Sequence, residues 1–223
     1  MRWPRRLWYW YFDALLGAWW QVRYRLRPGE PESLQTGERA PVLLIPGVYE
    51  TYRYLLAVGR RLHEAGHPVH VLHELEHNTV TIADGAAIAQ RYLDERDLRG
   101  VVIVAHSKGG LIGKHMMAVN DTSHRVGRMV AIASPFGGSV LARFAPVSTL
   151  RIFRATDPTL STLAKNLALN ARITSIFPEW DPMIPTRSEL QGATNVEIPV
   201  IGHFRILVNR AAMGAVLDAV DPV

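Results

Sequence analysis

The sequence predicts an α/β protein with a mostly parallel sheet of about six strands flanked by helices. From Pro41 onward, short apolar runs alternate with longer segments of helical period. Most of the short runs are continuous stretches of Val, Ile and Leu, which are typical of parallel strands buried on both faces. The chain has 223 residues, 48% hydrophobic and 20% charged, which fits one globular domain with a full core.

The expected elements follow from the period of the apolar residues. Six apolar runs have the length of buried strands: 42–45, 69–72, 101–105, 128–133, 173–177 and 196–201. Four segments have a helical period: 52–65, 79–96, 108–118 and 205–220. These elements all lie in residues 41–223, which we therefore treat as one domain. Residues 30–40 are polar and rich in turn formers, as a linker would be.

Residues 1–29 differ from the rest of the chain and predict a separate amphipathic helix. They contain five of the six tryptophans. On a helical wheel, polar residues form one narrow stripe and apolar residues cover the remainder. The apolar stretch 7–22 would span about 24 Å as a helix, less than a hydrocarbon core of about 30 Å. We expect this helix to lie at a membrane surface. The alternatives are packing on the protein itself or on a second copy and, with weaker support, a signal peptide.

Charge and cysteine content exclude several classes of function. The chain has no cysteine, which excludes disulfide scaffolds, thiolate metal sites and cysteine nucleophiles. The 25 Lys and Arg and 20 Asp and Glu give a net charge of +5. Six of these arginines and one aspartate lie in residues 1–27, so the rest of the chain has equal numbers of each sign. The basic excess therefore belongs to the N-terminal segment, and no nucleic-acid partner is expected.

Ser107 lies in a pattern of strand, sharp turn and helix. The apolar run 101–105 leads directly into His106, Ser107 and Lys108, followed by apolar residues at helical spacing. A serine at the apex of such a turn adopts a strained backbone and needs small neighbours two residues away, which Ala105 and Gly109 provide. The turn exposes the hydroxyl at the carboxyl ends of the strands, and a Ser107 that only caps a helix is the weaker interpretation.

This turn, A-H-S-K-G, resembles the nucleophile elbow of the α/β-hydrolases, and in particular of small bacterial lipases and esterases whose elbow begins with Ala. The resemblance covers residues 41 to the end and implies the order serine, acid, histidine. Of the three histidines after Ser107, only His203 leaves room for a preceding acid at a strand end. Asp181, in a Pro-rich loop after the run 173–177, resembles the acid of the family. Asp157 and then Glu179 are the alternatives.

The resemblance also implies an oxyanion hole made of backbone N–H groups. One donor would be Lys108, the residue after the nucleophile. The other would be Val48, in the loop after the first strand of the domain, where Pro46 replaces the usual histidine of the family. The side chain of Lys108 is expected to point away from Ser107. Residues 139–169 would cover the acyl pocket or simply the sheet.

The function expected from the resemblance is hydrolysis of lipid-like carboxylic esters by a Ser107, His203 and Asp181 triad through an acyl-enzyme. Thioesterase, amidase or acyltransferase chemistry and a non-catalytic binding protein are the alternatives. No cofactor or metal is expected, because the histidine-rich run 63–77 crosses several elements and offers no pair on one helix face. We expect a bacterial protein, either cytoplasmic or at the membrane periphery, and secretion stays open.

Overall fold

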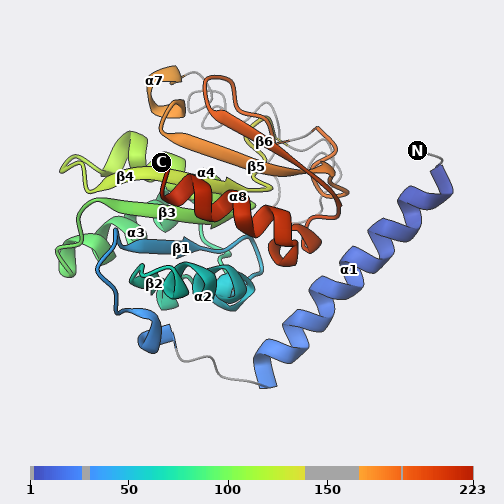
Figure 1. Cartoon of the computed structure of the whole chain (residues 1–223), viewed down its shortest axis with the longest axis horizontal. Helices are drawn as coiled ribbons and strands as arrows, with labels where there is room; N and C mark the ends of the chain where they lie inside the picture. Colours follow the sequence, from blue (N-terminus) through green and yellow to red (C-terminus); the bar gives the residue numbers. More distant parts are fainter. Residues whose placement is uncertain (1–2, 27–30, 139–165, 187, 223) are drawn as a thin grey trace.

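The computed structural model describes residues 3–26, 31–138, 166–186 and 188–222, and a six-stranded parallel sheet lies at its centre (Figure 1). The strand order is β2-β1-β3-β4-β5-β6. The predicted fold class is confirmed, and every predicted strand is present. The strands are β1 (Val42–Ile45), β2 (Val69–Val71), β3 (Val101–His106), β4 (Val126–Ile132), β5 (Ile173–Trp180) and β6 (Thr194–Ile201).

Helices cover both faces of this sheet. The helices α2 (Leu56–Glu64) and α8 (Arg210–Val220) lie on one face, and α3 (Ile82–Glu95) and α4 (Lys108–His115) lie on the other (Figure 1). Successive side chains of a strand point to opposite faces, so β1 contributes alternately to two hydrophobic cores. This double burial explains why the strands appear in the sequence as continuous apolar runs.

The helices differ from the predicted segments mainly at their ends. The predicted helix 52–65 begins with a 3₁₀ turn, Tyr52–Leu55, before α2. The predicted helix 205–220 is likewise split into a 3₁₀ turn, Arg205–Val208, and α8. The split falls at Asn209, whose side chain accepts a hydrogen bond from the amide of Ala212 at 3.0 Å and so caps α8.

The strand order determines where loops meet. The chain leaves β1 for its neighbour β2 on one side and returns to β3 on the other side of β1. The loops after β1 and β3 therefore lie next to each other at the carboxyl edge of the sheet. In open α/β sheets this reversal of strand order is where ligands bind.

The N-terminal helix α1 (Trp3–Leu26) packs along the outside of the sheet domain (Figure 1). Asp13, Gly17 and Trp20 form its buried side. The hydroxyl of Tyr54 donates a hydrogen bond to the carbonyl of Gly17 at 2.9 Å, and the Trp20 ring meets the Tyr54 ring edge to face. Packing on the protein itself therefore occurs along one side of α1.

The structure describes only parts of the expected linker, residues 30–40, and of the segment 139–169. Within the expected linker, Pro31–Leu34 forms a 3₁₀ turn with Leu34 buried against the core. Of the segment 139–169, residues 139–165 lie outside the described residues, and the short helix α7 (Leu167–Asn170) follows. Of the helices in the described ranges, none combines the length and apolar character needed to cross a bilayer.

Candidate active site

Ser107 occupies the sharp turn between β3 and α4. Its backbone has φ 51° and ψ −120°, a conformation that is strained for a residue with a side chain. The turn is held by the Ser107 amide, which donates to the carbonyl of Ile132 at 2.9 Å. Strain at this position, stabilised by the surrounding sheet, is the geometry expected of a nucleophile elbow.

Gly109 shows why small residues are needed around this turn. A Cβ at position 109 would lie 2.1 Å from the carbonyl oxygen of Ile45, at the end of β1. Because the obstacle is backbone in a central strand, it cannot move aside as a flexible side chain would. Glycine at this position therefore allows α4 to start directly behind β1.

Asp181 and His203 lie in contact at the ends of β5 and β6. The Asp181 Oδ2 atom lies 2.7 Å from His203 Nδ1, and both side chains are buried. The other carboxylate oxygen of Asp181 accepts the amides of Met183 and Ile184, at 2.7 and 3.0 Å. These bonds fix the carboxylate, which in turn orients the imidazole and favours a proton on Nδ1, leaving Nε2 to act as the base.

The two alternative acids are not placed in this way. Glu179 is exposed near the end of β5 and Asp157 lies outside the described residues. Of the three acids that the sequence offered, the structure brings Asp181 to His203.

Burial and charge have opposite effects on the pKa values of Asp181 and His203. Burial raises the pKa of Asp181, but the charge and hydrogen bond of His203 and two backbone amides lower it more, so the net pKa lies below the ordinary value. Burial lowers the pKa of His203, but the charge and hydrogen bond of Asp181 raise it more, with further charge effects from Glu50 and Asp13. The net pKa of His203 therefore lies above its ordinary value.

His203 lies beside the elbow. Its ring centroid is 4.7 Å from that of His106, the residue immediately before Ser107. Among the described residues no hydrogen bond joins Ser107 to His203. Such bonds are often long in enzymes without substrate and shorten in the reacting complex.

The expected oxyanion donors occupy two neighbouring loops. Lys108 is the first residue of α4, where backbone N–H groups have no intrahelical acceptor. Val48 is half-buried in the loop after β1. Within the part of the chain that the structure describes, neither amide donates to a protein acceptor, whereas the Gly47 amide donates to Glu50 Oε2 at 2.8 Å. Both amides therefore keep their hydrogen-bonding capacity for a ligand.

The Lys108 side chain does point away from Ser107, as the sequence predicts. Its Nζ donates to the carbonyls of Asn78, at 2.9 Å, and Val80, both in the loop between β2 and α3. The Asn78 amide group in turn donates to the carbonyl of Pro46 at 2.6 Å. Burial lowers the pKa of Lys108 to about 8. Sequence reasoning did not foresee this network, which ties the elbow to the loop of Val48.

The fold is similar to that of several solved hydrolases. The mature form of lipase BlEst2 from Bacillus licheniformis matches with a TM-score of 0.63 at 14% identity, covering 83% of this chain and 92% of that one. The propeptide form of the same lipase matches with a TM-score of 0.66 at 14% identity. This match covers 83% of this chain and 52% of that longer chain. Alpha/beta hydrolase domain-containing protein 10 from mouse gives 0.57 at 15% identity, covering 83% and 89%. The chain has the α/β-hydrolase fold. Neither a protein-family model nor a curated protein matches the sequence.

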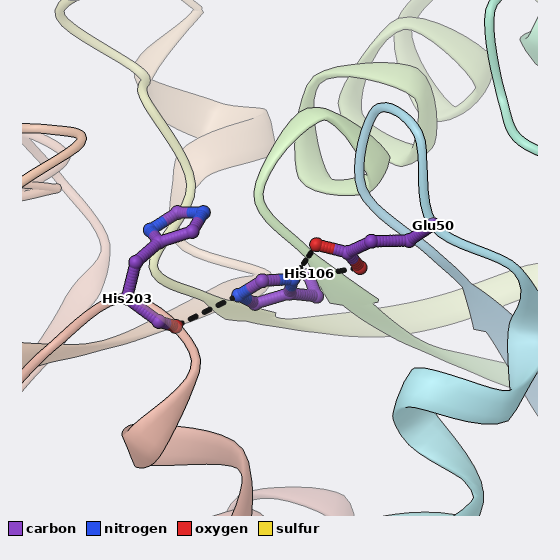
Figure 2. A group of neighbouring side chains, drawn as sticks. All are labelled: Glu50, His106 and His203. Atoms are coloured by element: carbon purple, nitrogen blue, oxygen red, sulfur yellow. Dashed lines mark hydrogen bonds and ion pairs between the residues drawn. The ribbon is translucent and has the colours of Figure 1, made fainter. Parts of the chain in front are cut away.

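Within this α/β-hydrolase fold, a buried pair formed by Glu50 and His106 supports the candidate site (Figure 2). Both carboxylate oxygens of Glu50 lie 2.8 to 2.9 Å from His106 Nδ1, and His106 Nε2 lies 3.1 Å from the backbone carbonyl of His203. The carbonyl can only accept, so Nε2 donates to it, while Nδ1 is hydrogen-bonded to the Glu50 carboxylate. The pair thus links the Gly47 loop, the elbow and the His203 backbone.

Ligand-type atoms of Glu50, His106 and His203 lie within 4.8 Å of one another, the spacing of a possible metal site (Figure 2). However, both His106 ring nitrogens and the Glu50 carboxylate already bind protein groups. A metal ion would have to break these bonds. We therefore interpret the group as a hydrogen-bonded support of the loops.

The histidine-rich run does not supply this cluster. As a sequence pattern the run indicates histidines in turns or in solvent, which is wrong for two of them. His67 and His70 are buried and bond to Ala40, Asp221 and Tyr92 through their ring nitrogens. His67 thus joins the end of the linker to the end of α8, and His70 joins β2 to α3.

Asp13 connects α1 to the candidate base. Its carboxylate accepts the backbone amides of His203 at 2.8 Å, Phe204 at 3.1 Å and Arg205 at 3.2 Å. Gly202 is required beside it, because its φ is 124° and a Cβ there would lie 2.4 Å from Asp13 Oδ1. Sequence reasoning missed this role, although Asp13 is the one acid among residues 1–27.

Proposed function

We propose that this protein is a serine hydrolase that cleaves carboxylic esters of lipid-like substrates through Ser107, His203 and Asp181. The observation that carries the proposal is the buried 2.7 Å contact between Asp181 and His203 beside a strained serine turn. An acid that orients a histidine next to a strained serine is the arrangement of acyl-transferring hydrolases.

In the proposed reaction, His203 Nε2 takes the Ser107 hydroxyl proton while Oγ forms a bond to the ester carbonyl carbon. The amides of Lys108 and Val48 donate to the resulting oxyanion, each donor contributing about 10²- to 10³-fold in rate. The bond to the alcohol oxygen then breaks, and His203 returns its proton to the leaving alcohol. Water, deprotonated by His203, attacks the acyl-enzyme and releases the acid with Ser107 restored.

The lipid-like character of the substrate rests on the resemblance to lipases and esterases. A panel of p-nitrophenyl esters of increasing chain length, with a matched thioester and an amide, tests the acyl chemistry. Preferred turnover of the longer esters supports the proposal. Turnover confined to the thioester or the amide would replace it with one of those activities.

The catalytic residues are tested on the same panel. We expect Ser107→Ala to abolish turnover and Asp181→Asn to lower kcat by about 10⁴-fold, because the imidazole loses its orienting carboxylate. The exposed Ser123 provides the control, since Ser123→Ala should keep full activity. Undiminished turnover by Ser107→Ala would contradict the proposal. An unaffected Asp181→Asn variant would move the acid to Asp157 or Glu179.

A further inference from the structure

The outward side of α1 carries a continuous stripe of exposed apolar and aromatic side chains. Each member is 45% to 63% exposed. The spacing of three and four residues places them on one side of the helix. The Phe12 ring contacts those of Trp8 and Tyr11, with centroids 5.9 and 6.0 Å apart. We call this set the aromatic stripe: Trp8, Tyr11, Phe12, Leu15, Trp19 and Val22.

The inward side of α1 fixes the direction in which the aromatic stripe points. Asp13 binds three amides of the His203 loop, and Gly17 fits against the Phe204 ring, where a Cβ would lie 2.7 Å from a ring carbon. Trp20 is buried between Tyr54 and Phe204. With these contacts made, the helix cannot rotate to bury the stripe on its own domain.

The charge of the same segment is strongly one-sided. Residues 1–27 contain six arginines, three before the apolar stretch and three after it. Their one acid, Asp13, is fully buried and its carboxylate is bonded to backbone amides. The rest of the chain is formally balanced. In the sequence, the stripe therefore lies between two arginine-rich runs.

We propose that α1 docks on an anionic lipid bilayer, parallel to its surface, with the aromatic stripe in the headgroup region. Tryptophan and tyrosine favour this region, and arginines at both ends would meet lipid phosphates. A second copy of α1 is a poorer partner, because it would bring six further arginines against the first six. The same charge that opposes self-association favours an anionic surface.

Docking in this way would bring the candidate site close to the membrane. Asp13 lies on the side of α1 opposite the stripe and binds the loop of His203. The bilayer surface and this loop would then be separated by about one helix diameter, roughly 10 Å. This consequence rests on the proposed function, whereas the docking itself does not.

The test is flotation of the full chain with vesicles of phosphatidylglycerol and phosphatidylcholine, compared with vesicles of phosphatidylcholine alone. We expect binding to the anionic vesicles that weakens with added salt. The triple variant Trp8→Gln, Phe12→Gln, Leu15→Gln should bind anionic vesicles with an affinity at least about tenfold lower. Glutamine is compatible with the helix but removes apolar area from the stripe. The control is Val119→Gln, which changes an apolar residue of similar exposure outside α1 and should bind normally.

Circular dichroism and thermal unfolding of each variant verify that the fold is intact, independently of any enzymatic activity. Equal vesicle binding by the triple variant and the parent would overturn the proposal. So would a parent that forms a dimer through the stripe and ignores anionic vesicles. Vesicle binding without ester turnover would leave the docking surface in place and contradict only the proposed function.

Discussion

Asp13 is the residue whose placement most extends the candidate site. It lies 190 residues before His203, yet its carboxylate accepts the His203 amide at 2.8 Å and the next two amides of the loop. It thereby holds the loop that carries the candidate base. Its negative charge also contributes to raising the pKa of His203. Asp13 is therefore a positioning residue that also influences how His203 titrates.

The first prediction concerns Asp13→Asn. The asparagine retains one acceptor oxygen but removes the charge, so the raised pKa of His203 should fall toward its ordinary value. The base works in its neutral form, so activity rises as pH increases through this pKa. The acid limb of kcat/KM against pH for a soluble ester should therefore move to lower pH in the variant.

The control for this change is Asp218→Asn, an exposed carboxylate of α8, which should leave the profile in place. The pKa of His203 is raised by the charges of three carboxylates: Asp181, Glu50 and Asp13. In the Asp13→Asn variant, Asp181 and Glu50 still raise it. An acid limb that is unchanged or moves to higher pH would contradict the effect assigned to the Asp13 charge on the pKa of His203.

At the residue scale, sequence could identify groups whose roles are local or ordered along the chain. Ser107 was identified from its strand and its small neighbours, and His203 from the order of the partners. Glu50, His106 and Asp13 were missed because their roles come from contacts between residues 56 to 190 positions apart. Apolar period and turn composition contain no information about such contacts.

At the scale of elements, the elbow depends on close packing of α4 against the end of β1. The Lys108 amide can serve as an oxyanion donor only if α4 starts at this place. Gly109 allows this close approach, because a Cβ at this position would meet the Ile45 carbonyl. The elbow is thus as much a packing feature of two elements as a property of its five residues.

The second prediction is that Gly109→Ala impairs both activity and stability. The new Cβ would collide with the Ile45 carbonyl at 2.1 Å, so the start of α4 must shift. Loss of the Lys108 donor would lower kcat by about 10²- to 10³-fold. Overpacking of this kind costs about 1–3 kcal/mol of unfolding free energy. Ester kinetics and urea unfolding measure the two effects.

Gly214 in α8 provides the matched control, since a Cβ there would meet nothing within 4 Å. Alanine is also the better helix former, so Gly214→Ala should keep full activity and gain up to about 1 kcal/mol. A Gly109→Ala protein with parental kcat would show that the elbow tolerates the shift and that the packing argument is wrong.

Element boundaries show where sequence was less informative. Apolar runs predict all six strands, because parallel strands buried on both faces consist almost entirely of apolar residues. Helix ends were placed less well, as at Asn209, where a cap splits the predicted helix 205–220. For α1, the pattern predicted an amphipathic helix but not which side would face the protein, since Trp8 and Trp20 look alike in the sequence and have opposite exposures.

At the scale of the whole molecule, the sheet brings together groups from distant parts of the chain. The loops after β1, β3, β5 and β6 meet at the carboxyl edge and contribute Val48, Ser107, Asp181 and His203 in turn. The N-terminal helix adds Asp13 from outside the sheet. The alternation of strands and helices was sufficient to predict this common edge, but not the support that α1 gives it.

The proposed function requires Ser107 to be an activated nucleophile. A fluorophosphonate probe reacts with such serines, and peptide mass spectrometry locates the adduct. We predict one adduct per chain, on the peptide containing Ser107, with none in Ser107→Ala and much slower labelling in Asp181→Asn. A folded parent protein that takes up no probe, or takes it up on another serine, would contradict the account.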